Sequence, residues 1–258
     1  MKINYHDGEA VDLRFDRRLH SYKIEDEVVP SATRILDIIS KPALVPWALK
    51  VGVGWLEKNF FHDEESSSKK TNIYKSAMGL EPLLKGIKSA YRSKSTDALN
   101  IGNITHDWVE NAISFKLGEI KHEDLMPLPQ QEEAVNSIGA FKDWVGQNVV
   151  EWHSAEEKLY HRKYKYAGTL DARATINGEY CVIDWKTSKA VYPEYHLQVA
   201  AYAKAAEDVH GKEVEATYIL RCDKATGRFE AVRSEDIDKN FEAFMAAYTL
   251  FKRIKELR

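Results

Sequence analysis

Several features are scarce or missing in this sequence, and each absence excludes a class of protein. Only two cysteines, Cys181 and Cys222, occur in 258 residues, too few for a four-cysteine iron–sulfur cluster or a zinc ribbon. The formal net charge is −3, so no overall positive potential indicates nucleic acid, and such a partner must be bound by a local patch or through a metal. No apolar run approaches the length of a membrane span, and the N-terminus lacks the features of a targeting peptide. We therefore expect a cytoplasmic protein without membrane contact.

A nucleotide-binding loop is also missing. The sequence has no G-x-x-x-x-G-K-[ST] motif, whose backbone amides and lysine would hold nucleotide phosphates. We therefore expect no nucleotide cofactor and, given the cysteine count, no iron–sulfur cluster. The content of 44% hydrophobic and 30% charged residues is ordinary for a globular protein.

The order of the expected elements indicates an α/β fold. Residues 131–147 have helical spacing, residues 150–161, 164–176 and 180–186 have strand character, and residues 194–209 are again helical. A second hairpin and a closing helix follow, and further helices precede this set. We find no internal repeat and no long linker that would mark a domain boundary.

The strongest local signal is the hairpin centred on Asn177-Gly178. Asn-Gly between two strand-forming runs favours a two-residue turn, because both residues must adopt positive φ. In that register the numbers of facing residues sum to 355, so Asp171 faces Asp184. Lys186, two positions further on, lies on the same side of the sheet.

Two opposed carboxylates destabilise a strand pair unless a cation compensates them. Mg²⁺ is usually held by one or two carboxylates together with substrate phosphate oxygens, and such an ion activates water and stabilises charge on a phosphate. A lysine beside it orients or deprotonates the attacking water, or stabilises the developing charge. The alternative is a solvated strand surface on which Lys186 neutralises two exposed acids. The geometry alone does not separate these interpretations.

The residues around the hairpin resemble a known family. GTLDARATINGEYCVIDWKTSK and YHLQVAAY resemble the RecB-like exonuclease branch of the PD-(D/E)XK nuclease superfamily, and are similar to its mitochondrial genome maintenance and phage-type exonucleases. Asp171, Asp184 and Lys186 match the D…(D/E)xK residues, and Gln198 and Tyr202 match the downstream QxxxY. The resemblance implies a restriction-endonuclease-like core, a mixed central sheet flanked by helices, with an N-terminal helical addition.

The resemblance also implies ligands outside the hairpin. His106, after a glycine on an upstream helix, would complete the metal site, and the main-chain carbonyl of Trp185 would be a further ligand. Glu110, one helical turn beyond His106, either supports the ligands or is an ordinary surface acid.

An acid is implied on the preceding strand, fifteen residues before Asp171. This spacing favours Glu156 as a catalytic residue, and a gap of one residue would transfer the role to Glu157. Adjacent strand residues point to opposite faces, so only one of the two can face the metal. The other would support the site from behind or be solvated.

Substrate contacts are expected beside Lys186 and on the following helix. Thr187, Ser188 and Lys189 are candidates for contacts with phosphate. Gln198 and Tyr202 are four residues apart, so both can face one groove, where an amide and a ring would contact the substrate. The alternative for this helix is packing on the sheet, with Tyr202 partly in the core.

We expect residues 1–258 to form a single nuclease domain. Residues 31–115 would form a helical arch or cap, residues 150–233 the catalytic sheet with the QxxxY helix, and residues 234–258 a closing helix. In the exonucleases that the chain resembles, N-terminal helices admit strand ends. The resemblance therefore implies a deoxyribonuclease that uses one or two Mg²⁺ or Mn²⁺ ions and degrades DNA from a free end.

The expected substrate is DNA, single-stranded or with a free end, in recombination, repair or replication. A single-strand annealing or recombination protein is a candidate partner, and the chain would act in the cytoplasm of a host cell or, if phage-encoded, of an infected bacterium. Two alternatives stay open: a DNA-binding partner protein that keeps the fold but cuts weakly or not at all, and a structure-specific endonuclease.

Overall fold

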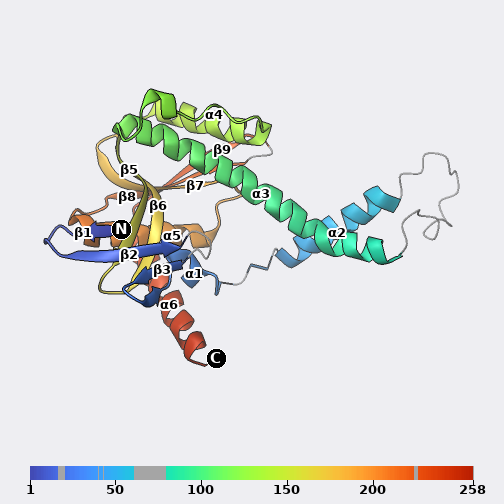
Figure 1. Cartoon of the computed structure of the whole chain (residues 1–258), viewed down its shortest axis with the longest axis horizontal. Helices are drawn as coiled ribbons and strands as arrows, with labels where there is room; N and C mark the ends of the chain where they lie inside the picture. The colour runs from blue at the N-terminus through green and yellow to red at the C-terminus, as the bar shows by residue number, and fades with distance from the viewer. Residues whose placement is uncertain (17–20, 40, 43, 61–79, 224–225, 258) are drawn as a thin grey trace. The chain divides into compact units, whose positions relative to one another are not determined.

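The computed structural model describes residues 1–16, 21–39, 41–42, 44–60, 80–223 and 226–257. The chain divides into two compact units, one formed by Met1–Ile39 with Ile101–Arg258 and the other by Ser40–Asn100 (Figure 1). Helix α3 (Leu80–Leu117) continues from the second unit into the first. Among the described helices, none combines the length and the apolar character needed to cross a membrane.

The larger unit contains a five-stranded mixed sheet with the order β5-β6-β7-β8-β9. The first three strands are antiparallel neighbours, and their bounds confirm the predicted strands to within two residues. β7 pairs in parallel with β8, so the chain returns through a crossover helix, α5. These elements are β5 (Val150–His161), β6 (Tyr166–Ile176), β7 (Glu179–Lys186), α5 (Pro193–His210), β8 (Ala216–Cys222) and β9 (Phe229–Ser234).

Helices cover both faces of this sheet (Figure 1). On one face, Val109 and Ile113 of α3 and Phe141 and Trp144 of α4 (Glu132–Gln147) pack with strand residues in one hydrophobic core. On the other face, α5 and α6 (Ile237–Glu256) contribute to a second core. A short 3₁₀ helix, His122–Asp124, lies between α3 and α4. The sheet is therefore buried on both sides, as its apolar strands indicate.

The N-terminal residues form a second, four-stranded antiparallel sheet. Leu13 and Tyr22 of this sheet belong to the same core as α5, and the Tyr5 hydroxyl donates to the carbonyl of Tyr160 at 2.7 Å. Ser31 is the N-cap of the helix that follows this sheet, since its hydroxyl accepts the amide of Arg34 at 3.1 Å. The elements are β1 (Lys2–Asn4), β2 (Ala10–Asp16), β3 (Ser21–Ile24), β4 (Glu27–Val29) and α1 (Ala32–Leu36).

Two helices are described in the smaller unit, α2 (Leu44–Phe60) and the N-terminal part of α3. The two helices approach closely at Gly86, where an added Cβ would overlap the ring of Trp55. The helical addition was expected over residues 31–115, whereas the second compact unit is Ser40–Asn100, and residues 61–79 lie outside the described part.

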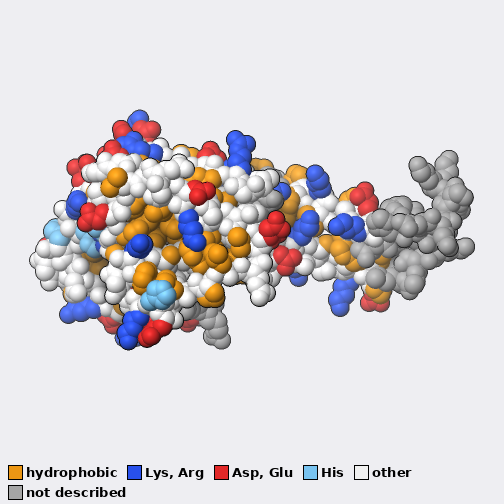
Figure 2. All heavy atoms as spheres, turned by 90° about the horizontal axis from the view of Figure 1, so that it is seen from above, with side chains coloured by type: hydrophobic (Ala, Val, Ile, Leu, Met, Phe, Trp, Pro, Cys, Tyr) orange, Lys and Arg blue, Asp and Glu red, His pale blue; other side chains and the backbone are white. Residues whose placement is uncertain are grey.

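The two units differ in charge. Residues 40–100 contain ten Lys and Arg against six Asp and Glu, which leaves 27 against 34 in the rest of the chain. Figure 2 shows blue and red side chains interspersed over the larger unit, with no continuous patch of either sign on the face that it presents. The molecule as a whole is mixed α/β with two sheets, compatible with the expected α/β core.

Candidate active site

Three predicted site residues from three different elements meet in the larger unit. His106 of α3, Glu156 of β5 and Asp171 of β6 each offer a ligand atom, and these atoms all lie within 4.8 Å of one another. The imidazole Nδ1 of His106 is 3.6 Å from Asp171 Oδ1. We refer to these three residues as the acid–histidine cluster.

His106 lies on the side of helix α3 that packs against the sheet. Val109 and Ile113, three and seven residues further on, are 1% exposed and anchor the same helical face in the core. At Gly102 the helix passes Thr187, because an added Cβ would lie 3.1 Å from the Thr187 hydroxyl oxygen. A glycine therefore permits the close approach that brings His106, one turn later, to Asp171.

Asp184 and Lys186 of β7 lie next to this cluster. The Lys186 ammonium is 2.5 Å from Asp184 Oδ2, and Asp184 is 1% exposed. The predicted register is confirmed over five pairs, from Ile176–Glu179 to Ala172–Ile183.

The ladder ends before Asp171 and Asp184, which were expected to face each other as its next pair. Instead, the Trp185 amide donates to the Asp171 carboxylate at 2.6 Å. The Asp171 side chain thus takes the place of a backbone acceptor at the point where the pairing of the two strands ends.

Helix α5, which covers the face of the sheet opposite to α3, contacts Asp184 directly. The Gln198 amide nitrogen donates to Asp184 Oδ1 at 3.3 Å and to the Tyr202 hydroxyl at 3.0 Å. Tyr202 is 4% exposed, and a Cβ added at Gly168 would lie 2.5 Å from its ring. Gln198 therefore reaches the site, whereas Tyr202 lies in the core beneath it.

The segment after Lys186 holds the three residues expected to contact phosphate. Thr187 faces α3, the Ser188 hydroxyl donates to the carbonyl of Ala190 at 2.7 Å, and Lys189 is exposed. Arg221 of β8, 3% exposed, donates to the carbonyls of Ser188 and Lys189 at 3.0 Å each. A buried guanidinium therefore fixes the backbone of this segment.

The two remaining acids lie in different places. Glu110 is close enough for its charge to act on Glu156. Glu157 is outside the cluster, because its carboxylate is bonded to Ser154, Arg173 and His210. The two neighbouring glutamates are directed to different surroundings, and the one that meets His106 and Asp171 is Glu156, whose φ of 46° is left-handed and not that of an extended strand.

A local sequence similarity accompanies this geometry. Over 62 residues, the chain is 42% identical to mitochondrial genome maintenance exonuclease 1 of the mouse, Mus musculus. The match covers 21% of this chain and 18% of the relative, so the chain matches less than a fifth of that protein's length. No protein-family model matches the chain. The similarity supports a relationship to nucleases.

The acids of the site differ in their pKa values. Burial, together with the negative charges of Asp171 and Glu110, raises the pKa of Glu156 to about 7. Burial and the charge of Asp171 raise the pKa of Asp184 to about 6, despite the opposing effect of Lys186. Burial also acts on Asp171, but the neighbouring His106 and Lys186 and the Trp185 amide lower its pKa below the usual value.

Neighbouring carboxylates favour the charged forms of the two basic groups. Burial favours the neutral forms, but Asp171 raises the pKa of His106 and Asp184 raises the pKa of Lys186. Lys186 is therefore an ammonium group that can donate hydrogen bonds and stabilise negative charge. Deprotonation of water by this amine is not favoured in this state.

The donor set fits a hard divalent cation. Carboxylate oxygens suit Mg²⁺ and Mn²⁺, and an imidazole is a normal ligand for Mn²⁺. Asp184 Oδ2 is buried and makes no hydrogen bond of good geometry with any described residue, although the Lys186 ammonium lies beside it. His106, Glu156, Asp171 and Asp184 could thus hold a cation that would also reduce the repulsion among the carboxylates.

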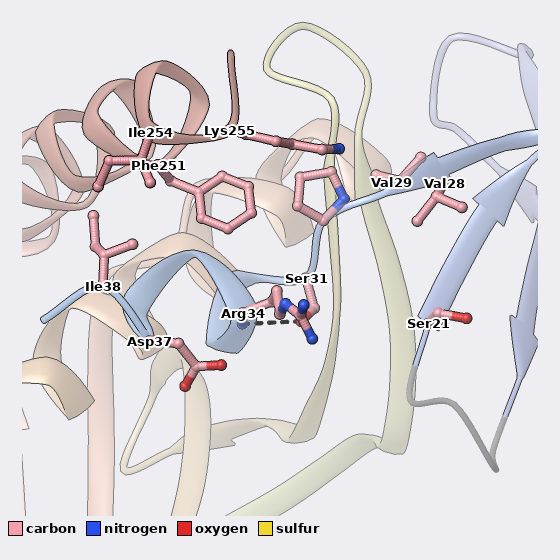
Figure 3. A pocket seen from close by; sticks show the side chains of 11 residues that line it. Ser21, Val28, Val29, Ser31, Arg34, Asp37, Ile38, Phe251, Ile254 and Lys255 are labelled. Atoms are coloured by element: carbon pink, nitrogen blue, oxygen red, sulfur yellow. Dashed lines mark hydrogen bonds between the residues drawn. The ribbon is translucent and has the colours of Figure 1, made fainter. Parts of the chain in front are cut away.

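An open pocket of about 800 Å³ lies elsewhere in the larger unit. Figure 3 shows its wall of side chains, with Phe251, Ile254 and Lys255 from α6 and Arg34, Asp37 and Ile38 from α1 and the turn after it. None of the predicted site residues lines it.

Two residues near the site were not predicted from the sequence. Arg221 follows a run of mostly apolar residues in β8. No motif in the neighbouring sequence indicates that its guanidinium contacts the segment after Lys186. Tyr195 lies near Lys186, with 4.9 Å between the ammonium and the ring centroid. Its position three residues before Gln198, on the same helical face, is the signal that could have identified it.

Proposed function

We propose that this chain is a metal-dependent deoxyribonuclease of the PD-(D/E)XK type, with a restriction-endonuclease-like core, that degrades DNA from a strand end. The observation that carries the proposal is the meeting of His106, Glu156 and Asp171 within 4.8 Å, next to the point where the pairing of β6 with β7, the strand of Asp184 and Lys186, ends. The local similarity to an exonuclease supports the same reaction class.

In this proposal, the cation is held by Asp171, Asp184 and His106, with Glu156 beside them. A residue in an extended strand directs its N–H and its C=O to the same neighbouring strand. The Trp185 N–H points to Asp171 on β6, so the Trp185 carbonyl projects to the same side and is suited as a further ligand. A bound Mg²⁺ or Mn²⁺ lowers the pKa of coordinated water and stabilises charge on a phosphate.

The other residues of the site would orient the substrate. The Lys186 ammonium would donate to a phosphate oxygen or to the attacking water, which places positive charge where negative charge develops. Thr187, Ser188 and Lys189 would contact the neighbouring phosphates from a backbone that Arg221 keeps fixed. Gln198 would keep the Asp184 carboxylate in position.

The preference for strand ends rests on the helical unit Ser40–Asn100. Its excess of Lys and Arg suits a segment that follows a DNA backbone, in contrast to the acidic remainder of the chain. We propose that this unit restricts the substrate to DNA with a free end, in recombination, repair or replication.

The test uses 5′- and 3′-labelled single strands, duplexes and covalently closed circles, with Mn²⁺ or Mg²⁺ and with EDTA. We expect linear DNA to be degraded only with the metal and circles to stay intact. Lys186→Ala should lower cleavage by about a thousandfold while metal and DNA binding persist. Lys239→Ala, a change of an exposed lysine on α6, is the matched control.

Each alternative has its own outcome. Cleavage of closed circles would identify an endonuclease. Equal DNA binding with EDTA and with metal, without cleavage of any substrate, would identify a binding protein and overturn the proposal.

A further inference from the structure

Helix α5 presents a row of polar and aromatic side chains to strand β7. Tyr195, Gln198 and Tyr202 are spaced by three and four residues, so they lie on one helical face. Gln198 bonds to Asp184, and Tyr202 bonds to Gln198 from the core. Tyr195, in the first turn of α5, is the member of this row nearest to the end of β7.

The ring of Tyr195 lies beside the Lys186 ammonium, with 4.9 Å between Nζ and the ring centroid. This distance is within the range of a cation–π interaction, in which the negative face of a ring attracts a cation. The Tyr195 side chain also interacts with Ser188, and Tyr192 packs edge-on against the ring at 5.5 Å. Tyr195 is partly buried at the border of the core, so water competes only in part for the ammonium.

Lys186 thus has two neighbours of different character. Asp184 Oδ2 is 2.5 Å away and forms an ion pair, whereas the Tyr195 ring is neutral. In the proposed reaction, the Asp184 carboxylate is also a ligand of the metal ion, so its attraction for the Lys186 ammonium is weaker. The ring is not a metal ligand and keeps its attraction for the ammonium throughout the reaction.

We propose that Tyr195 is a positioning residue that keeps the Lys186 ammonium directed at the reacting phosphate. This inference rests on the proposed nuclease function. Tyr195 acts through Lys186, and the part of the side chain that acts is the ring.

The experiment compares Tyr195→Leu with Tyr195→Phe, which keeps the ring and removes the hydroxyl. For Leu we expect kcat on a labelled single strand to fall roughly ten- to thirtyfold, with KM and the DNA affinity in EDTA unchanged within about twofold. Phe should stay within about threefold of the wild type. Tyr192→Leu removes the neighbouring ring at the N-cap of α5, leaves the ring of Tyr195 in place, and is the matched control.

A second measurement examines the contact itself, independently of activity. In a ¹³C-lysine NMR spectrum, the ε-methylene signal that disappears in Lys186→Ala should be shifted upfield by the ring. The shift should be lost in Tyr195→Leu and kept in Tyr195→Phe.

Several outcomes would overturn the proposal. Equal losses in Leu and Phe would assign the effect to the hydroxyl and Ser188, and a raised KM would make Tyr195 a DNA contact. Unchanged kcat in Leu, or no upfield shift in the wild type, would show that the ring does not position Lys186. If the wild type cleaves no DNA, the proposed function itself fails, a result that the variants do not produce.

Discussion

Glu156 and Glu157 are neighbours on β5, yet they lie in opposite electrostatic environments. Glu157 accepts the Ser154 hydroxyl and the Arg173 guanidinium at 2.5 Å each, and its second oxygen is 2.6 Å from His210 Nε2. Burial alone would raise the Glu157 pKa, but these partners lower it to about 2. We refer to Glu157, Ser154, Arg173 and His210 as the Glu157 network.

The acid–histidine cluster has the opposite effect on its glutamate, since it raises the pKa of Glu156. Glu156 has a φ of 46°, a left-handed conformation that is rare for a residue with a side chain. It faces Asp171 and lies within the field of Glu110, and its pKa rises to about 7. Both acids are partly buried, so burial does not distinguish them. The two acids differ in their charged neighbours. Glu157 is compensated by Arg173 and His210, whereas the nearest charges to Glu156 include the carboxylates of Asp171 and Glu110.

The largest effect should follow a change in the cluster itself. Asp171→Asn removes one negative charge, while the amide oxygen can still accept the Trp185 N–H, so the variant should fold. We expect cleavage to fall by at least about a thousandfold. Mn²⁺ should raise the melting temperature of the wild type but not of the variant. An equal increase in both proteins would place the ion elsewhere.

The converse result is expected for the Glu157 network. Glu157→Gln leaves the largely buried Arg173 without its carboxylate, which should cost about 3 kcal/mol of the free energy of unfolding. Cleavage per folded molecule should be retained, because Glu157 does not face the cluster. The measurements are urea denaturation and the cleavage rate at a temperature where the variant is folded. Glu213→Gln, on an exposed acid, is the control, and a large loss of cleavage in Glu157→Gln would remove the distinction between the two regions.

The smallest effect is the pH dependence of stability in EDTA. The folded-state pKa of Glu156 is raised to about 7, so its contribution is fully present below about 4.5 and lost as the pH rises through 7. Glu156→Gln should therefore gain stability over the wild type between pH 5 and 8, by about 1–3 kcal/mol.

Glu157 should give the opposite trend, because its pKa is lowered to about 2. Its contribution is present above about 4.5 and is lost as the pH falls toward 2, so the deficit of Glu157→Gln should shrink on acidification. Parallel curves for the two variants would contradict the assigned environments.

Much of this arrangement could be predicted from local sequence signals. Asn177-Gly178 fixes the register of β6 and β7, and Asn177 has the positive φ (53°) that the predicted turn requires. From that register, Asp171, Asp184 and Lys186 were predicted to lie on one side of the sheet. The register could not predict that the ladder ends one pair earlier, because the Asp171 side chain competes with the backbone for the Trp185 amide.

Other features depend on contacts between distant segments. Gly86 and Gly102 both lie inside α3, which is continuous over 38 residues. Each glycine accommodates a neighbour, Trp55 in one case and Thr187 in the other. The boundary between the two units at Asn100 could not be predicted from the sequence, because α3 continues across it without a break.

The continuous helix has a consequence for how the length of this chain can change. Gly102 and His106 are one turn apart on α3, a rise of about 6 Å, and each meets a different partner on the sheet, Thr187 and Asp171. One inserted residue between them would turn the imidazole by about 100° about the helix axis, away from the carboxylate. Insertions and deletions should thus be tolerated in surface loops of the larger unit and selected against in the five residues from Gly102 to His106.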